Sequence, residues 1–142
     1  MPLSIEERQS FLAEPHVAAL AVTAEEGRAP VTVPVWYMYE PGGDVLVMTE
    51  RGSRKAGLIT AAGRFSLLVQ RTSPTLRYVS VEGPVASIEP ATEEEHRVLA
   101  ARYLPADGVA DYLTQAVANA TDLVNFRLRT ERWLSADLGL QG

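Results

Sequence analysis

Short turns between strand-like segments constrain the fold of this chain more than any other feature. The apolar segment 16–23 runs into the turn signal 24–27, and a second strand-like segment, 28–39, reaches the turn at 41–43 before the apolar run 44–49. Turns of this length join antiparallel neighbours, because parallel strands need a crossover connection of a dozen or more residues. The sequence therefore predicts a largely antiparallel sheet.

The rest of the chain adds strands and a few helices to this sheet. Capping boxes, Ser4 with Glu7 and Thr92 with Glu95, predict helix starts because each pair satisfies free backbone N–H groups. The expected helices cover 5–13, 53–62, 91–103 and 109–120, the further strands cover 64–72, 77–88 and 123–129, and 133–137 is expected to be a tail. We expect one mainly β domain over residues 1–142, a small antiparallel barrel with added helices.

Pro34 lies inside the second strand-like segment. A proline has no backbone N–H and removes one hydrogen bond from a β-ladder. The strand is therefore expected to have a bulge, an edge position or a bound ligand at Pro34.

The stretch 44–63 has the pattern of a strand that turns sharply into a helix. Ser53 is a candidate N-cap and Gly63 a candidate helix end, with Arg54 and Lys55 in the first helical turn. Free N–H groups and the helix dipole favour an anion at such a start, and Lys55 is the only lysine of the chain. The residues fit a phosphate site, and they fit an ordinary solvated helix start as well.

Composition excludes several classes of function. The chain has 142 residues, no cysteine and two histidines, so disulfides, thiolate nucleophiles and cysteine-bound metals are excluded, and we expect no metal site. A net charge of −5 argues against nucleic-acid binding. The start of the chain lacks the pattern of a signal peptide, and no apolar run approaches the roughly 20 residues of a membrane span. We expect a cytoplasmic protein that binds neither nucleic acid nor membrane.

Catalytic motifs are missing from the sequence, which favours cofactor chemistry. Neither histidine lies in a hydrolase or metalloprotease motif, and the turn glycines do not form a dinucleotide-binding fingerprint. The acidic run 93–95 begins a predicted helix, where it complements the helix dipole. In hydride transfer the cofactor carries the difficult chemistry, so the protein needs no strong acid or base.

Several motifs in order resemble one known family. These are Val-Pro-Val-Trp-Tyr at 33–37, Thr49, Ser-Arg-Lys-Ala at 53–56, Phe-Ser-Leu at 65–67 and Arg-Tyr-Val-Ser-Val-Glu-Gly-Pro at 77–84. Together they resemble the pyridoxamine-5′-phosphate-oxidase-like split-barrel superfamily, over about residues 4 to 135, and within it the actinobacterial branch that uses the deazaflavin coenzyme (F-420) or FMN. The resemblance implies a split β-barrel that forms a homodimer with two cofactor sites at the interface.

The resemblance also implies roles for individual residues. Arg54 and Lys55 would hold the cofactor phosphate, with Thr49 and Ser53 beside them. A strand would line the flavin-type ring, partly through backbone groups: Val33, Pro34, Val35 and Trp36. Packing between barrel and helices is an equally open role for Trp36 and Tyr37. Gln70, Arg71 and Arg77 would reach the site or the dimer interface.

Two departures argue against vitamin B6 oxidation. Tyr78 stands where the B6 oxidases have a glutamine, and the chain lacks their basic C-terminal segment. The expected function is hydride transfer from reduced deazaflavin, or from FMN, to a conjugated organic acceptor. The alternatives are a flavin-binding protein without turnover, for storage or sensing, and a barrel whose helix start binds no phosphate. No catalytic residue is predicted.

Overall fold

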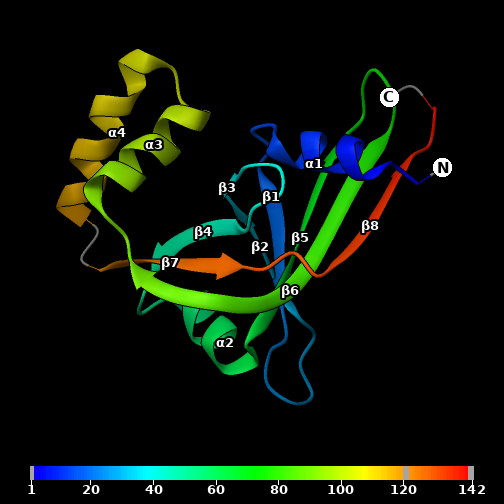
Figure 1. Cartoon of the computed structure of the whole chain (residues 1–142). Coiled ribbons are helices and arrows are strands. Elements are labelled where there is room, and N and C mark those ends of the chain that lie inside the picture. The colour runs from blue at the N-terminus through cyan, green and yellow to red at the C-terminus, as the bar shows by residue number, and fades with distance from the viewer. Residues whose placement is uncertain (1, 120–121, 141–142) are drawn as a thin grey trace.

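The computed structural model describes residues 2–119 and 122–140, with the backbone alone at 116–119. Within these ranges the chain forms four helices and eight strands (Figure 1). The helices are α1 (Ile5–Ala13), α2 (Arg54–Ala62), α3 (Glu93–Tyr103) and α4 (Ala106–Asn119). The strands are β1 (Ala18–Val22), β2 (Val31–Val35), β3 (Met38–Tyr39), β4 (Val45–Glu50), β5 (Arg64–Arg71), β6 (Arg77–Pro90), β7 (Leu123–Leu128) and β8 (Arg132–Asp137).

All described strands belong to one antiparallel sheet that curls into an open barrel. The strand order is β2-β1-β5-β6-β7-β4-β3, with β8 paired to β6 beside this path. The two ends of the path, β2 and β3, are joined through Trp36 and Tyr37 rather than by a ladder. Figure 1 shows α1 and α2 at opposite ends of the barrel, and α3 and α4 together on one side. The predicted mainly β fold with added helices is confirmed.

Strand β6 belongs to both halves of the sheet. Its first part pairs with β5 and β8, and its last part, from Val85 onward, pairs with β7. β6 changes its partner strands just after Gly83 and Pro84, where the segment 129–131 crosses β6 closely. A Cβ atom built on Gly83 would lie 1.8 Å from the Arg129 carbonyl oxygen, so this crossing requires a glycine.

The core fills the inside of the curled sheet. Leu20, Leu67 and Val81 face one another across β1, β5 and β6 and are fully or almost fully buried. Phe11 of α1 and Ile59 of α2 close this core from the two ends. Because side chains alternate along a strand, the intervening residues lie on the outer face.

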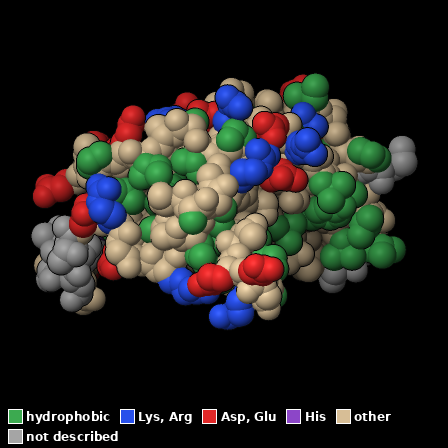
Figure 2. Space-filling model, turned by 90° about the horizontal axis from the view of Figure 1, so that it is seen from below, with side chains coloured by type: hydrophobic (Ala, Val, Ile, Leu, Met, Phe, Trp, Pro, Cys, Tyr) green, Lys and Arg blue, Asp and Glu red, His purple; other side chains and the backbone are tan. Residues whose placement is uncertain are grey.

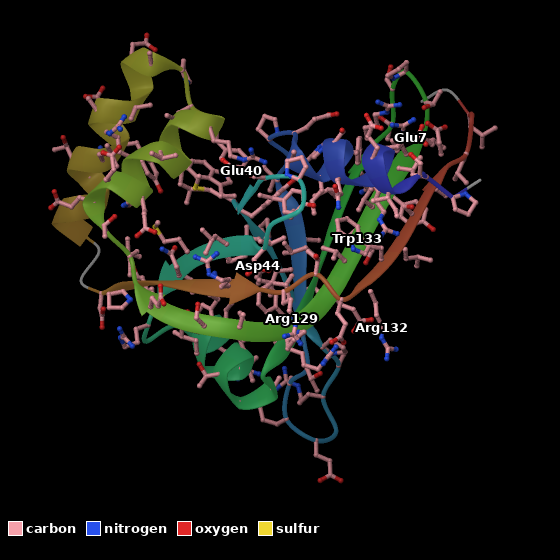
Figure 3. All side chains as sticks on the ribbon, in the orientation of Figure 1. Glu7, Glu40, Asp44, Arg129, Arg132 and Trp133 are labelled. Carbon is pink, nitrogen blue, oxygen red and sulfur yellow. The ribbon has the colours of Figure 1, made fainter. Side chains whose placement is uncertain are left out.

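Strand β8 corrects the expectation of a C-terminal tail at 133–137. It pairs with β6 over its whole length, and Trp133 packs against the core while Arg132 points to the other face, as Figure 3 shows. The guanidinium of Arg8 lies 4.6 Å from the centre of the Trp133 ring. An isolated Trp-Leu-Ser-Ala segment shows little period-two alternation, which is why the strand was not expected.

The expected strand 28–39 is two strands in the structure. Trp36 and Tyr37 leave the ladder between β2 and β3, since the buried Tyr37 hydroxyl donates to the carbonyl oxygens of Leu12, at 2.5 Å, and Glu14, at 3.0 Å. Bonding to α1 therefore overrides strand continuation here.

Helix α4 also differs from expectation. It begins at Ala106, directly after Pro105, rather than near Val109. The expected last residue of this helix, Ala120, lies outside the described residues. Both predicted capping boxes are present, at α1 and at α3.

Candidate functional site

Two strand edges without partners border the opening of the barrel. β2 pairs only with β1, and β4 beyond Leu46 pairs only with β7, because β3 is too short to cover it; both statements concern the described residues. Such edges present free backbone N–H and C=O groups that a ligand can use. The edge position also explains Pro34, since one side of an edge strand needs no ladder partners.

The helix start predicted from the sequence is formed as expected. The Ser53 hydroxyl accepts a hydrogen bond from the Ala56 N–H at 3.1 Å, and Gly63 ends α2 in the left-handed conformation with φ of 71°. Thr49, at the end of β4, lies with its hydroxyl 3.4 Å from that of Ser53. Two hydroxyl groups thus stand together where the helix N–H groups are free.

Lys55 is half-buried beside this helix start. Among the described residues it makes no hydrogen bond and no ion pair. Burial lowers the pKa of its ammonium group below 10.5, and the charge of Glu50 acts in the opposite direction. A partly desolvated cation without a partner is a suitable group for binding an anion.

Arg54, in contrast, already forms an ion pair with a carboxylate of the chain itself. Its Nη1 and Nη2 donate to the two carboxylate oxygens of Glu25 at 2.9 and 3.0 Å. The hydrogen bonds from Arg54 lower the pKa of Glu25 to about 2. Sequence reasoning missed Glu25, since it lies in the turn between β1 and β2 and carries no motif. The ion pair places the helix start beside the turn between β1 and β2.

The residues at 33–36 divide between barrel and helices. Val33 packs against the core and Val35 is buried in it, whereas Pro34 is exposed on the outer face. The Trp36 ring stacks on Tyr103 of α3, with centroids 4.8 Å apart and planes 9° apart, and it lies 5.4 Å from the ring of Tyr112 of α4. The packing role left open for Trp36 is therefore present; its contact with a cofactor ring stays a prediction.

Gln70 and Arg77 lie far from the helix start within one chain. β5 begins directly after α2, so Gln70 is roughly 20 Å along the strand from the end of that helix. Arg77 follows on the paired strand, where its Nε donates to Asp137 at 2.9 Å, and Arg71 lies 3.6 Å from the same carboxylate. The structure brings Thr49, Ser53, Arg54 and Lys55 together; a role for the distant residues in the same site remains a prediction.

The side chains of this site suit ligand binding rather than acid–base or nucleophilic catalysis. It combines hydroxyl groups, a free ammonium group and helix N–H groups, all of which suit a phosphate. In the part of the chain that the structure describes, no group of three His, Asp or Glu side chains is placed to hold a metal ion. The described helices are also too short or too polar to cross a membrane.

An open antiparallel barrel of this topology, with a helix start at its opening, defines a split β-barrel protein. The family model of pyridoxamine 5′-phosphate oxidase matches residues 4–135. The chain belongs to this family. No curated protein sequence matches the chain.

Solved structures with the same fold support this assignment. A conserved hypothetical protein from Mycobacterium tuberculosis is 27% identical with a TM-score of 0.74, and the match covers 99% of this chain and 90% of that one. An F-420 reductase is 23% identical with a TM-score of 0.70, covering 89% and 94%. A FAD-binding protein from Mesorhizobium loti is 22% identical with a TM-score of 0.61, covering 96% and 95%.

Proposed function

We propose that this protein is a flavin-type oxidoreductase that transfers a hydride from reduced deazaflavin, or from FMN, to a conjugated organic acceptor. The observation that carries the proposal is Lys55 at the start of α2, a half-buried cation that makes no hydrogen bond or ion pair with the residues the structure describes. The fold neighbours include an F-420 reductase and a FAD-binding protein, which supports a cofactor of this class.

The residues present fit a cofactor phosphate. Lys55 supplies the charge, and the hydroxyl groups of Thr49 and Ser53 together with the free N–H groups of α2 supply hydrogen bonds. Arg54 joins them only after releasing Glu25, because both of its terminal nitrogens are engaged. The free edge of β2 offers backbone groups to a ring that lies along it.

The chemistry itself belongs to the cofactor, which supplies a hydride when it is reduced and bound. The chain contributes binding and orientation: the phosphate contacts at α2 fix one end of the molecule, and the edge of β2 fixes the direction of the ring. Apolar barrel residues beside the opening, among them Val33, reduce the access of water. Solvent supplies the proton that completes reduction of the acceptor.

We also propose that two copies associate through the outer face of the sheet. A row of small and apolar side chains crosses this face at paired positions: Pro34, Ala19, Leu68, Ser80 and Leu134. Leu68 is 37% exposed and Leu134 is 64% exposed. Figure 2 shows hydrophobic side chains gathered on the side of the molecule that carries β8. An apolar sheet face of this kind supports an interface between copies, with the cofactor sites beside it.

The direct test is a fluorescence titration of the purified protein with F-420 and, in parallel, with FMN. Micromolar binding of F-420 in preference to FMN supports the deazaflavin assignment, and the reverse preference supports FMN. Binding of neither contradicts the proposal and leaves the barrel without a phosphate ligand.

Turnover needs a second measurement, because a binding protein for storage or sensing gives the same titration. The reduced cofactor is mixed with conjugated ketones and quinones, and its absorbance is followed with and without the protein. Oxidation that depends on the protein and on the acceptor supports a reductase. Tight binding with no acceleration for any acceptor favours the binding protein.

The cysteine-free composition fits the reducing cytoplasm, where we propose the protein acts.

A further inference from the structure

An apolar cavity lies between α3 and the sheet, away from the helix start of α2. It has a volume of about 170 Å³. Its apolar lining comes from three strand residues and two helix residues: Met38, Leu46, Met48, Val98 and Leu99. Val45 and Val47, which alternate with Leu46 and Met48 along β4, are fully buried in the core. The cavity therefore borders the outer face of the sheet and is separate from the core.

The way α3 is fixed explains why space remains beneath it. Leu99 and Ala100 are buried, and the hydroxyl of Tyr103 at the end of the helix donates to the carbonyl oxygen of His16 at 2.8 Å. Val98, which borders the cavity, is 38% exposed. The helix is thus packed through its C-terminal half and covers the outer face without filling it.

The lining also limits the kind of molecule that fits. The thioether side chains of Met38 and Met48 are flexible and polarizable, and they make favourable contacts with aromatic rings. Asn125, only 6% exposed, adds an amide to the lining. Glu94 and Glu95 bring two carboxylates, of which the first pairs with Arg97 and the second accepts the Thr92 N–H. These acceptors favour a ligand that donates a hydrogen bond and disfavour an anion.

We propose that this cavity is a binding site for a small, uncharged aromatic molecule of one or two fused rings that carries an N–H or O–H donor. A dry cavity of about 150 Å³ takes up benzene, so the size suits a ring system of this class. A protein partner does not fit, because the chain's own helix covers the face. The site does not depend on the proposed cofactor, since Met48 and the buried Thr49 lie on opposite faces of β4.

The test is a titration with indole, followed by NMR of the full chain carrying ¹³C-labelled methyl groups in methionine and isoleucine. We expect saturable shifts of the Met38 and Met48 methyl signals, with no shift for Ile59, a buried residue of α2 that does not line the cavity. Benzoate, an anionic ring of similar size, is expected to bind at least tenfold more weakly than indole. Absence of methyl shifts with millimolar indole overturns the proposal, as does equal binding of benzoate.

Substitutions that fill the cavity, compared with a control outside it, test where indole binds. Val98→Phe fills the cavity and is expected to weaken indole binding at least tenfold, whereas Ala101→Phe adds the same bulk at an exposed position of α3 outside the lining and leaves binding unchanged. Leu46→Trp fills the opposite wall and replaces the first variant if that one fails to fold, as judged by circular dichroism. Unchanged indole binding in a folded filling variant overturns the proposal.

Discussion

The guanidinium group of Arg54 and the carboxylate of Glu25 form a two-pronged ion pair between α2 and the turn before β2, with contacts of 2.9 and 3.0 Å. The two residues are 29 positions apart in sequence. The neighbouring cation, Lys55, makes no such contact in the described part of the chain. Two adjacent cations that look equivalent in the sequence therefore differ in their availability to a phosphate.

This difference predicts unequal effects of removing the two cations. Lys55→Ala is expected to weaken cofactor binding about tenfold, which corresponds to about 1.4 kcal/mol. Arg54→Ala should weaken it less, because a bound phosphate must first compete with Glu25 for the guanidinium. The double variant is expected to lose at least as much affinity as Lys55→Ala alone while keeping its fold. Equal losses in the two single variants would contradict the assignment, with affinity measured by cofactor fluorescence and folding by circular dichroism.

Glu25→Gln is expected to have the opposite effect. The change removes the carboxylate that holds Arg54 and leaves a second free cation at the helix start, so phosphate binding should tighten a few-fold. Glu26→Gln is the matched control, because it removes the same charge from the same turn without an ion pair to Arg54. A gain in both variants would show a general effect of net charge rather than release of Arg54.

The pH dependence of phosphate binding should follow Lys55. Burial lowers the pKa of this group from its ordinary 10.5, so its positive charge, and with it the affinity, is lost as pH rises through this lowered pKa. Glu25, with a pKa of about 2, stays charged throughout the neutral range and contributes no pH dependence there. Dissociation constants between about pH 7.5 and about pH 10.5 check this. The decline must disappear in Lys55→Ala; a decline of equal size in that variant would rule out Lys55 as its source.

Most of the fold could be predicted from local sequence patterns. Capping residues, turn glycines and apolar runs are short-range signals, and the helices and strands from Ile5 to Tyr103 largely follow them. Strand β8 did not follow from the sequence, because it is stabilised by its partner β6 rather than by its own alternation. The break at Trp36 and Tyr37 likewise depends on distant contacts: the Tyr37 hydroxyl bonds to Leu12 at the end of α1, and the Trp36 ring stacks on Tyr103, 67 positions later. No local pattern connects these residues.

The site was predictable where it is contiguous in sequence. Thr49, Ser53, Arg54 and Lys55 lie within one strand-turn-helix unit, so their proximity follows from local geometry. The ion pair that occupies Arg54 depends on how the β1–β2 turn folds back, and the sequence has no signal for that.

Gly83→Ala tests the crossing at which the two halves of the sheet meet. The added Cβ atom would lie 1.8 Å from the Arg129 carbonyl oxygen, which is backbone and moves only with the strands around it. We expect a loss of about 3 kcal/mol in the free energy of unfolding, measured by urea denaturation. Gly57→Ala is the control, since its Cβ meets nothing within 4 Å in α2 and should stabilise by about 0.5–1 kcal/mol. A neutral Gly83→Ala variant would contradict the close crossing.

Leu134→Glu tests the proposed association of two copies. Leu134 is 64% exposed and ends the apolar row that continues through Ser80 to Leu68. A carboxylate placed in a buried interface loses its hydration without gaining a partner, so we expect a monomeric variant and a dimeric natural chain. Ile5→Glu, at a similarly exposed position of α1 outside the row, should leave the mass unchanged. Light scattering after size-exclusion chromatography measures both masses. A Leu134→Glu variant that remains dimeric would show that the interface lies on another face.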